Sequence, residues 1–236
     1  MDPDYSQAHA ALAELYWRCA QFGWRFGSEF GVAPGVCKSR CYDYLEMTMR
    51  DPIPLSYRVS STVLLFGRQY ELSAVDAQKA IDLDPNGADN YSNMAIIYIY
   101  SGRAHEAVDL MKKAMRLDPH YQAWYLYILG LAHFTLEQYE AAAQIFEKTL
   151  KQNPNIYLVH WILPAAYAHL GQKEKAISAW KNFKKNVLTP LYSESHKFSF
   201  EFYKTTRIFF HPYKNSEDFD RLVDAFYKAW LYAKGN

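Results

Sequence analysis

The stretch GLAHFTLEQYEAAAQIFEKTLKQNP, residues 130–154, decides the fold of this chain. In its second half the apolar residues Ala142, Ile145, Phe146 and Leu150 keep the spacing of one face of an α-helix. The small Ala142 would let a partner helix approach closely, and the large Phe146 would fill the space beside it. The break at LEQ separates a first apolar helix from this second one, so the stretch predicts a helical hairpin.

The same pattern returns along the chain with a period of 34 or 35 residues. Pro85, Pro119 and Pro154 mark the connectors LDPNG, LDPHY and QNPNI at this spacing. Three ladders recur in register between them: Ala107, Ala142 and Ala176; Met111, Phe146 and Trp180; and Tyr98, His133 and Tyr167. A period of 34 with paired helices resembles the tetratricopeptide repeat. The resemblance implies an all-α, right-handed helical solenoid of about five helix pairs with a C-terminal capping helix.

The first unit is longer than one period, because Pro3 and Pro52 lie 49 residues apart. The excess falls at about residues 17–36, where three Phe-Gly pairs occur. We favour an elongated helix–loop whose aromatic side chains cover the end of the core over a dedicated binding hook. Residues 2–5 look like another connector but have no helix before them, so we expect Met1 to mark a cut in a longer protein.

The end of the chain departs from the repeat. Residues 196–210 alternate phenylalanines like a strand, yet a solenoid needs a closing helix here, and we expect a helix. Ser216 is the expected N-cap of a final amphipathic helix. Its apolar stripe comprises Phe219, Leu222, Val223, Phe226 and Trp230. We therefore divide the chain into a repeat array, residues 1–190, and a helical cap, residues 191–236.

Three segments are similar to one particular group of tetratricopeptide regions. They are FHPYKNSEDFDRLVDAFYKAWL near the C-terminus, LDPHYQAWYLYILGLAHF in the middle and DPDYSQAHAALAELYW at the start. Together they resemble the repeats that follow the catalytic domain of bacterial class III adenylate/guanylate cyclases and related regulators. The resemblance implies a regulatory or assembly segment with a possible catalytic or regulatory domain upstream.

Composition and motifs argue against several functions. With 26 basic and 25 acidic residues the formal net charge is +1, which favours neither a nucleic-acid partner nor a membrane partner. The sequence lacks the P-loop, dinucleotide-binding, nucleophile-elbow and HExxH motifs. We therefore expect no catalytic residues, no cofactor and no enzymatic activity.

The three cysteines, Cys19, Cys37 and Cys41, are too few for a disulfide framework and lack a fourth ligand for zinc. We expect buried thiols and no metal site. Neither a signal peptide nor a span long enough for a bilayer is visible in the sequence. These observations predict a cytoplasmic protein.

The tetratricopeptide resemblance also assigns a concave groove, which the first helix of each pair lines. The expected lining is Arg58, Phe66, Asn93, Ile96, Tyr100, Trp124, Tyr127, Leu131, Phe134 and Trp161. Such an aromatic lining suits an apolar helix or an extended peptide with bulky side chains. The alternative is that the chain fills the groove itself, with the Phe-Gly insertion or with the C-terminal helices.

The favoured hypothesis is a non-catalytic scaffold that binds a protein or peptide segment in this groove and regulates or assembles an attached signalling domain. One alternative is a sensor that binds an apolar small molecule in the same groove. Another is a self-association module that forms a dimer through this face.

Overall fold

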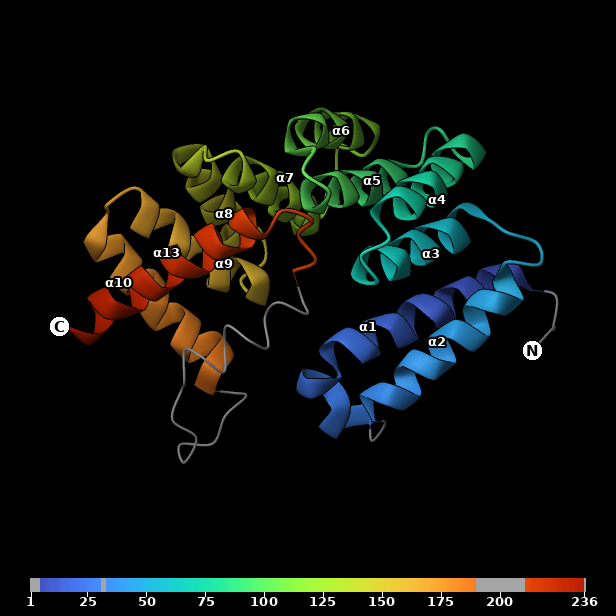
Figure 1. Cartoon of the computed structure of the whole chain (residues 1–236), viewed down its shortest axis with the longest axis horizontal. Helices are drawn as coiled ribbons and strands as arrows, with labels where there is room; N and C mark the ends of the chain where they lie inside the picture. The colour runs from blue at the N-terminus through green and yellow to red at the C-terminus, as the bar shows by residue number, and fades with distance from the viewer. Residues whose placement is uncertain (1–4, 31–32, 190–210, 236) are drawn as a thin grey trace. The chain divides into compact units, whose positions relative to one another are not determined.

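The computed structural model describes residues 5–30, 33–189 and 211–235, without the side chains of residues 22–30 and 34. Every regular element in these ranges is a helix and none is a strand (Figure 1), which confirms the all-α prediction. The helices are α1 (Ser6–Phe30), α2 (Pro34–Thr48), α3 (Pro54–Phe66), α4 (Tyr70–Leu83), α5 (Ala88–Tyr100), α6 (Ala104–Leu117), α7 (Ala123–Thr135), α8 (Tyr139–Gln152), α9 (Tyr157–His169), α10 (Lys173–Phe183), the π-helix η1 (Lys184–Leu188) and α13 (Ser216–Lys234).

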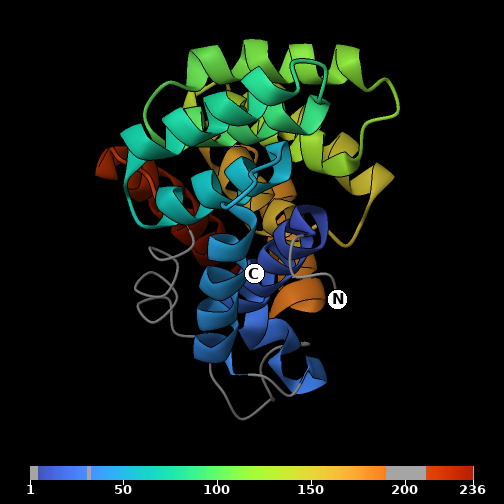
Figure 2. The same ribbon diagram turned by 90° about the vertical axis from the view of Figure 1, so that its right-hand side faces the viewer.

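The chain forms two compact units, Met1–Ile97 and Tyr98–Asn236, and α5 runs from one into the other. In the first unit α1 and α2 form one pair, which Figure 2 shows in blue, and α3 and α4 form the next. Helix α1 has 25 residues, whereas α3 and α4 have 13 and 14. The Phe-Gly side chains expected to cover the core lie outside the described residues.

Short turns in the second unit explain why the helices come as hairpins. Gly102 and Gly171 have φ values of 87° and 69°, and they end α5 and α9 in the left-handed region that glycine reaches without strain. Glu137 takes the same role after α7 with φ 61°. The amide of Gln138 donates to the carbonyl of His133 at 2.9 Å and closes that turn. All three breaks fall where the sequence predicts them.

Packing between the paired helices follows two of the predicted ladders, the alanines and the large side chains four positions on. Ala107, Ala142 and Ala176 are completely buried, as are Met111 and Phe146. The alanines sit where a larger side chain would hold the neighbouring helix away. The helix pairing is therefore fixed by the small-large alternation that the repeat carries.

Gly130 gives the closest approach in α7. A Cβ atom built there would lie 2.5 Å from the Phe146 ring on α8, and that ring is completely buried. Gly130→Ala is expected to lower the free energy of unfolding by about 1–3 kcal/mol, because the ring and both helices must shift. Urea unfolding followed by circular dichroism measures the change.

Gly35→Ala is the matched control for this substitution. Gly35 lies in the first turn of α2, and a Cβ atom there meets nothing within 4 Å. Alanine should leave stability unchanged or raise it slightly, since it removes glycine's freedom in the unfolded chain. Equal losses in the two variants would contradict the close packing of α7 on α8.

Helix α13 caps the second unit by packing on α9 and α10. Its N-cap is Asn215, whose side-chain oxygen accepts from the amide of Glu217 at 3.1 Å, so the prediction of Ser216 as the cap is wrong by one residue. Asparagine and serine cap equally well, and the sequence alone does not decide between neighbours. The helix expected at residues 196–210 and the connector at 2–4 lie outside the described residues.

Candidate partner-binding surface

In the first unit the two polar residues of the expected groove lining, Arg58 and Asn93, each pair with a polar side chain of a neighbouring helix. Arg58 Nη1 lies 2.9 Å from Asp89 Oδ2. The Asn93 side chain accepts from Ser61 Oγ at 2.8 Å and donates to Thr62 Oγ1 at 3.1 Å. These contacts join α3 to the start of α5, so the two polar lining residues help to hold the helices together.

Phe66 and Ile96, the apolar lining residues of the same unit, are half-buried. The Phe66 ring stands edge-on to Trp17 of α1, with 5.9 Å between the ring centroids. Phe66 packs with Trp17 against Cys41 and Val59 in the hydrophobic core of this unit. Phe66 therefore has a structural role in the core of this unit in addition to its expected place in the groove lining.

The cysteines differ from the expectation. Cys19 of α1 and Cys37 of α2 form a disulfide, and only Cys41 is a free, buried thiol among the described residues. The prediction of three thiols is wrong because α1 and α2 fold back on each other and bring two cysteines 18 positions apart to a Cα–Cα distance of 5.8 Å. With the disulfide present, the cysteines no longer support a cytoplasmic location, which stays a prediction.

In the second unit five of the six expected lining residues are buried. They are Tyr100, Tyr127, Leu131, Phe134 and Trp161. The Trp161 side chain is 1% exposed, whereas Trp124 is 40% exposed. An open aromatic groove is therefore absent from the described part of this unit, and only its Trp124 end is accessible.

The chain's own C-terminal segment covers this aromatic face. The His211 ring stacks on Trp161, with 4.3 Å between centroids and 29° between planes. The Tyr213 ring meets Tyr100 edge-on at 4.8 Å. Pro212 between them is also buried. The alternative in which the chain fills its own groove is thus realised here, by a connector and the helix that follows it.

Hydrogen bonds fix the segment in place. The Lys214 amide donates to the Tyr100 carbonyl at 2.7 Å, and Tyr100 Oη lies 3.3 Å from His211 Nδ1. The Tyr213 hydroxyl lies 3.5 Å from Thr135 Oγ1. Tyr100 is thereby joined to the C-terminal segment through its backbone, to Lys214, and through its side chain, to His211.

Burial keeps the tyrosines of this face uncharged. It raises the pKa of Tyr100 well above its ordinary value of 10, and the nearby phenols of Tyr127 and Tyr213 add to the shift. The pKa values of Tyr127 and Tyr213 are raised as well, again mainly by burial. The face therefore acts through neutral rings and hydroxyl groups at every physiological pH.

A second set of contacts holds α13 against the hairpins. Arg221 pairs with Glu137 in the turn after α7 and with Asp218 one turn before it. His169 at the end of α9 stacks on Tyr139 at 4.0 Å, and its Nε2 lies 3.3 Å from the Arg221 carbonyl. The start of α13 is thus fixed to the turn after α7 and to the end of α9.

His169 makes this contact sensitive to acid. Burial lowers its pKa below the ordinary value of 6.5, so the folded protein binds its proton less readily than the unfolded chain. Its contribution to the free energy of unfolding is therefore complete above about pH 6.5 and is lost as the pH falls through the folded-state pKa. Urea unfolding at pH 7.5 and pH 5.5 should show a smaller acid loss for His169→Gln than for the native chain. An identical loss in both proteins would contradict this role.

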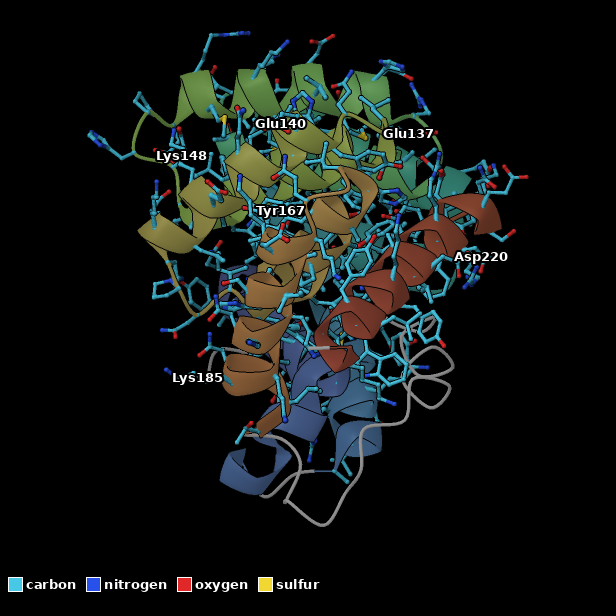
Figure 3. The ribbon with its side chains drawn as sticks, turned by 90° about the vertical axis from the view of Figure 1, so that its left-hand side faces the viewer. Glu137, Glu140, Lys148, Tyr167, Lys185 and Asp220 are labelled. Carbon is cyan, nitrogen blue, oxygen red and sulfur yellow. A yellow bond between two sulfur atoms is a disulfide. The ribbon has the colours of Figure 1, made fainter. Side chains whose placement is uncertain are left out.

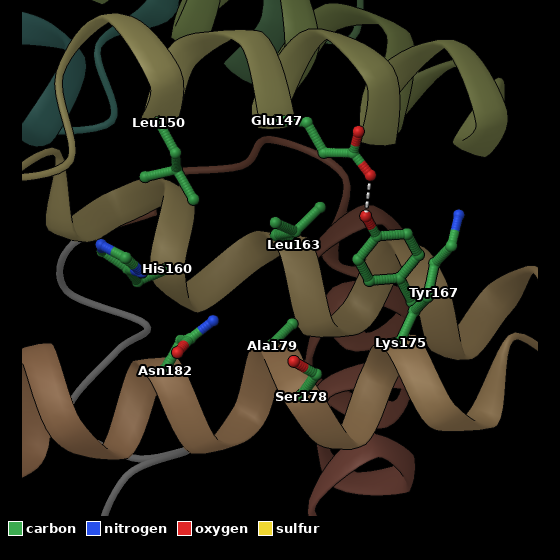
Figure 4. A pocket seen from close by; sticks show the side chains of 9 residues that line it. All are labelled: Glu147, Leu150, His160, Leu163, Tyr167, Lys175, Ser178, Ala179 and Asn182. Atoms are coloured by element: carbon green, nitrogen blue, oxygen red, sulfur yellow. Dashed lines mark hydrogen bonds between the residues drawn. The ribbon is translucent and has the colours of Figure 1, made fainter.

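A cavity of about 290 Å³ opens between α8, α9 and α10 (Figure 4). Leu150, Leu163 and Ala179 form its apolar part, and the Tyr167 hydroxyl donates to Glu147 at one end. Figure 3 shows Tyr167 within the stack of helices and Lys185 at its periphery. The lining offers no nucleophile paired with a base, which leaves the cavity without an evident chemistry.

Two further observations concern the described residues only. They contain no cluster of His, Cys, Asp or Glu side chains that could hold a metal ion. None of their helices is long and apolar enough to cross a membrane.

His211 and Tyr213 belong to this face, although the repeat pattern of the sequence does not predict them there. The connectors LDPNG and QNPNI are polar, whereas HPY places aromatic rings on both sides of its proline. That contrast is the signal in the sequence that could have identified the segment as a buried one.

Known proteins with tetratricopeptide repeats are similar to part of this chain. The sequence model of the tetratricopeptide repeat matches residues 88–154. Small glutamine-rich tetratricopeptide repeat-containing protein 2 of Mycosarcoma maydis is 32% identical over 84 residues, which are 35% of this chain and 24% of that protein. Human tetratricopeptide repeat protein 13 is 28% identical over 111 residues, 47% of this chain and 13% of that protein. The chain thus spans about a quarter or less of the length of these curated relatives.

Solved structures share the fold at low identity. PilW, a type IV pilus biogenesis factor, has a TM-score of 0.64 at 15% identity, covering 98% of this chain and 93% of its own. PilF of Pseudomonas aeruginosa has a TM-score of 0.59 at 17% identity, covering 97% and 96%. At this identity the likeness concerns the fold alone. Residues 88–154 therefore match the tetratricopeptide repeat, and the described helices have the fold of a tetratricopeptide-repeat solenoid.

Proposed function

We propose that this chain is a non-catalytic interaction module that binds a protein segment on the aromatic face of its second unit. Tetratricopeptide-repeat proteins generally mediate protein–protein interactions and are typically non-enzymatic scaffolds. The observation that supports this face is its occupant: the chain's own residues 211–214 lie across it with stacked rings and a backbone hydrogen bond. A face that holds one segment of the chain in this way has the chemistry to hold another.

Trp124 is the residue through which a partner first meets this face. It lies in the first turn of α7, is 40% exposed, and its ring lies 4.9 Å from that of Tyr127. An exposed tryptophan supported from below by a buried tyrosine has the properties of a binding hot spot. Substitution of Trp124 removes contact area on the accessible side and leaves the buried rings in place.

The test is affinity capture from the cells that produce the protein, with the native chain, Trp124→Ala and Tyr227→Ala as baits. Tyr227 is a 37% exposed aromatic on α13 and serves as the matched control. Trp124→Ala is expected to retain at least tenfold less of a specifically bound protein, which corresponds to a loss of about 1.4 kcal/mol. Equal capture by all three baits would refute the assignment of the face.

The proposal also covers the role of the whole protein. The array of residues 1–190, with its insertion at about 17–36, and the cap of residues 191–236 would regulate or assemble an attached signalling domain. This part rests on the resemblance to the repeats that follow class III cyclase domains. Proximity labelling from the full-length protein, with and without Trp124→Ala, tests whether the captured partner lies next to such a domain.

A further inference from the structure

The C-terminal segment contacts the second unit as a peptide ligand contacts a receptor. Tyr100 ends α5, and its carbonyl is one of the last four of the helix, which have no partner inside it. The Lys214 amide supplies that partner at 2.7 Å. A helix end that accepts from the backbone of a passing chain fixes the register of that chain, whatever its side chains are.

Three side chains in succession then meet different features of the face. His211 contributes a planar ring that stacks on Trp161 and a nitrogen 3.3 Å from Tyr100 Oη. Pro212 is buried and has no amide donor, so it leaves no unpaired N–H in apolar surroundings. Tyr213 places its ring edge-on against Tyr100 and its hydroxyl 3.5 Å from Thr135 Oγ1.

Each position therefore selects by chemistry. An aliphatic residue in place of His211 would lose the stacking on Trp161 and the contact of the ring nitrogen with Tyr100 Oη. A residue other than proline at position 212 would bring a buried backbone N–H that needs a hydrogen-bond acceptor. A residue shorter than tyrosine does not reach Thr135. Residues 211–213 present a planar nitrogen ring, a proline and a phenol to the face in that order.

We infer that the face formed by Tyr100, Trp161 and Thr135 is a recognition site for a His-Pro-Tyr segment, occupied in cis by residues 211–213. A separate partner protein that carries the same three-residue chemistry binds by replacing them. The inference rests on the proposed function and specifies the chemistry of the partner.

The attached segment, residues 211–213, competes with any free peptide for the same site. A segment attached to its own site has an effective concentration in the millimolar range, so a free peptide with the same contacts binds the native chain weakly. Weakening the attached segment removes this competitor and should raise the apparent affinity of the free peptide. The order of affinities among variants is therefore the informative quantity.

The probe is the fluorescein-labelled peptide FFHPYKNS, the sequence of residues 209–216, titrated by fluorescence anisotropy with the full chain. Tyr213→Ala is expected to bind it at least tenfold more tightly than the native chain, and Tyr227→Ala is expected to bind it as the native chain does. The control peptide FFAPAKNS should bind none of the three. Equal affinity for both peptides, or no binding to Tyr213→Ala at 1 mM peptide, would overturn the inference.

A measurement on the native chain covers the case in which Tyr213→Ala does not fold. With 2 mM FFHPYKNS, hydrogen exchange at residues 211–219 should rise, while α9 stays protected. FFAPAKNS should leave exchange unchanged, and an unchanged rate with both peptides would overturn the inference.

If the peptide fails while Trp124-dependent capture persists, the proposed function stands and only this partner chemistry is wrong. A dimer of the native chain that Tyr213→Ala abolishes in light scattering would put a second copy in the site and would also overturn it.

Discussion

Trp161→Ala is expected to lower the free energy of unfolding by about 3–5 kcal/mol, the loss typical of a large side chain deleted from a core. Trp161 is 1% exposed and packs between the His211 ring and Phe226, with centroid distances of 4.3 and 5.8 Å. Alanine leaves a cavity where the C-terminal segment and α13 meet α9. These surroundings belong to different parts of the chain, so they cannot close the cavity without losing other contacts.

Trp124→Ala is the matched control, because the same chemical change occurs at a 40% exposed position of the same face. Its cost should stay below about 1 kcal/mol, since little buried volume is lost. Urea unfolding followed by circular dichroism compares both variants with the native chain. A small, equal effect of both substitutions would mean that the segment of residues 211–214 does not cover α9.

The repeat could be predicted because its signals are local. Ala142 and Phe146 lie four residues apart on one helix, and their counterparts return at a fixed period. Both are completely buried, and the hairpin turn falls at Glu137 as expected. A pattern of about 34 residues can be recognised from the sequence alone, because each further copy of it supports the same helical hairpin.

The state of the groove could not be predicted, because it depends on contacts between distant residues. The sequence identifies Tyr100 and Trp161 as members of one face through the repeat register. It carries no periodic signal for His211, which is 111 positions away from Tyr100. The repeat register therefore does not predict whether the aromatic face is open or covered by another part of the chain.

The disulfide shows the same limit in the first unit. Cys19 and Cys37 are 18 positions apart, and only the antiparallel pairing of α1 and α2 brings them together. The sequence predicts an elongation here but gives no register between the two longer helices. Without that register the choice between thiols and a disulfide had to rest on composition, which gave the wrong result.

Phe226→Ala is expected to cost about 3–5 kcal/mol and to release α13 from the end of the array. Phe226 is completely buried, and its ring lies 5.0 Å from Trp180 and 5.2 Å from Phe183. These contacts join α13 to α10, and terminal repeats need such a cover to keep their apolar side from water. Loss of the cover should expose the aromatic residues of α9 and α10 and promote aggregation.

Tyr227→Ala changes the next residue on the same helix and is the control, because Tyr227 is 37% exposed whereas Phe226 is completely buried. Binding of the dye 1-anilinonaphthalene-8-sulfonate and light scattering at increasing temperature should separate the two variants, with an earlier onset for Phe226→Ala only. Helix α13 makes most of its contacts with α9 and α10, so the two variants differ mainly in whether the cap stays docked. If Phe226→Ala unfolds at the temperature of Tyr227→Ala without binding the dye, the array is stable without its cap, and α13 has a role other than closing it.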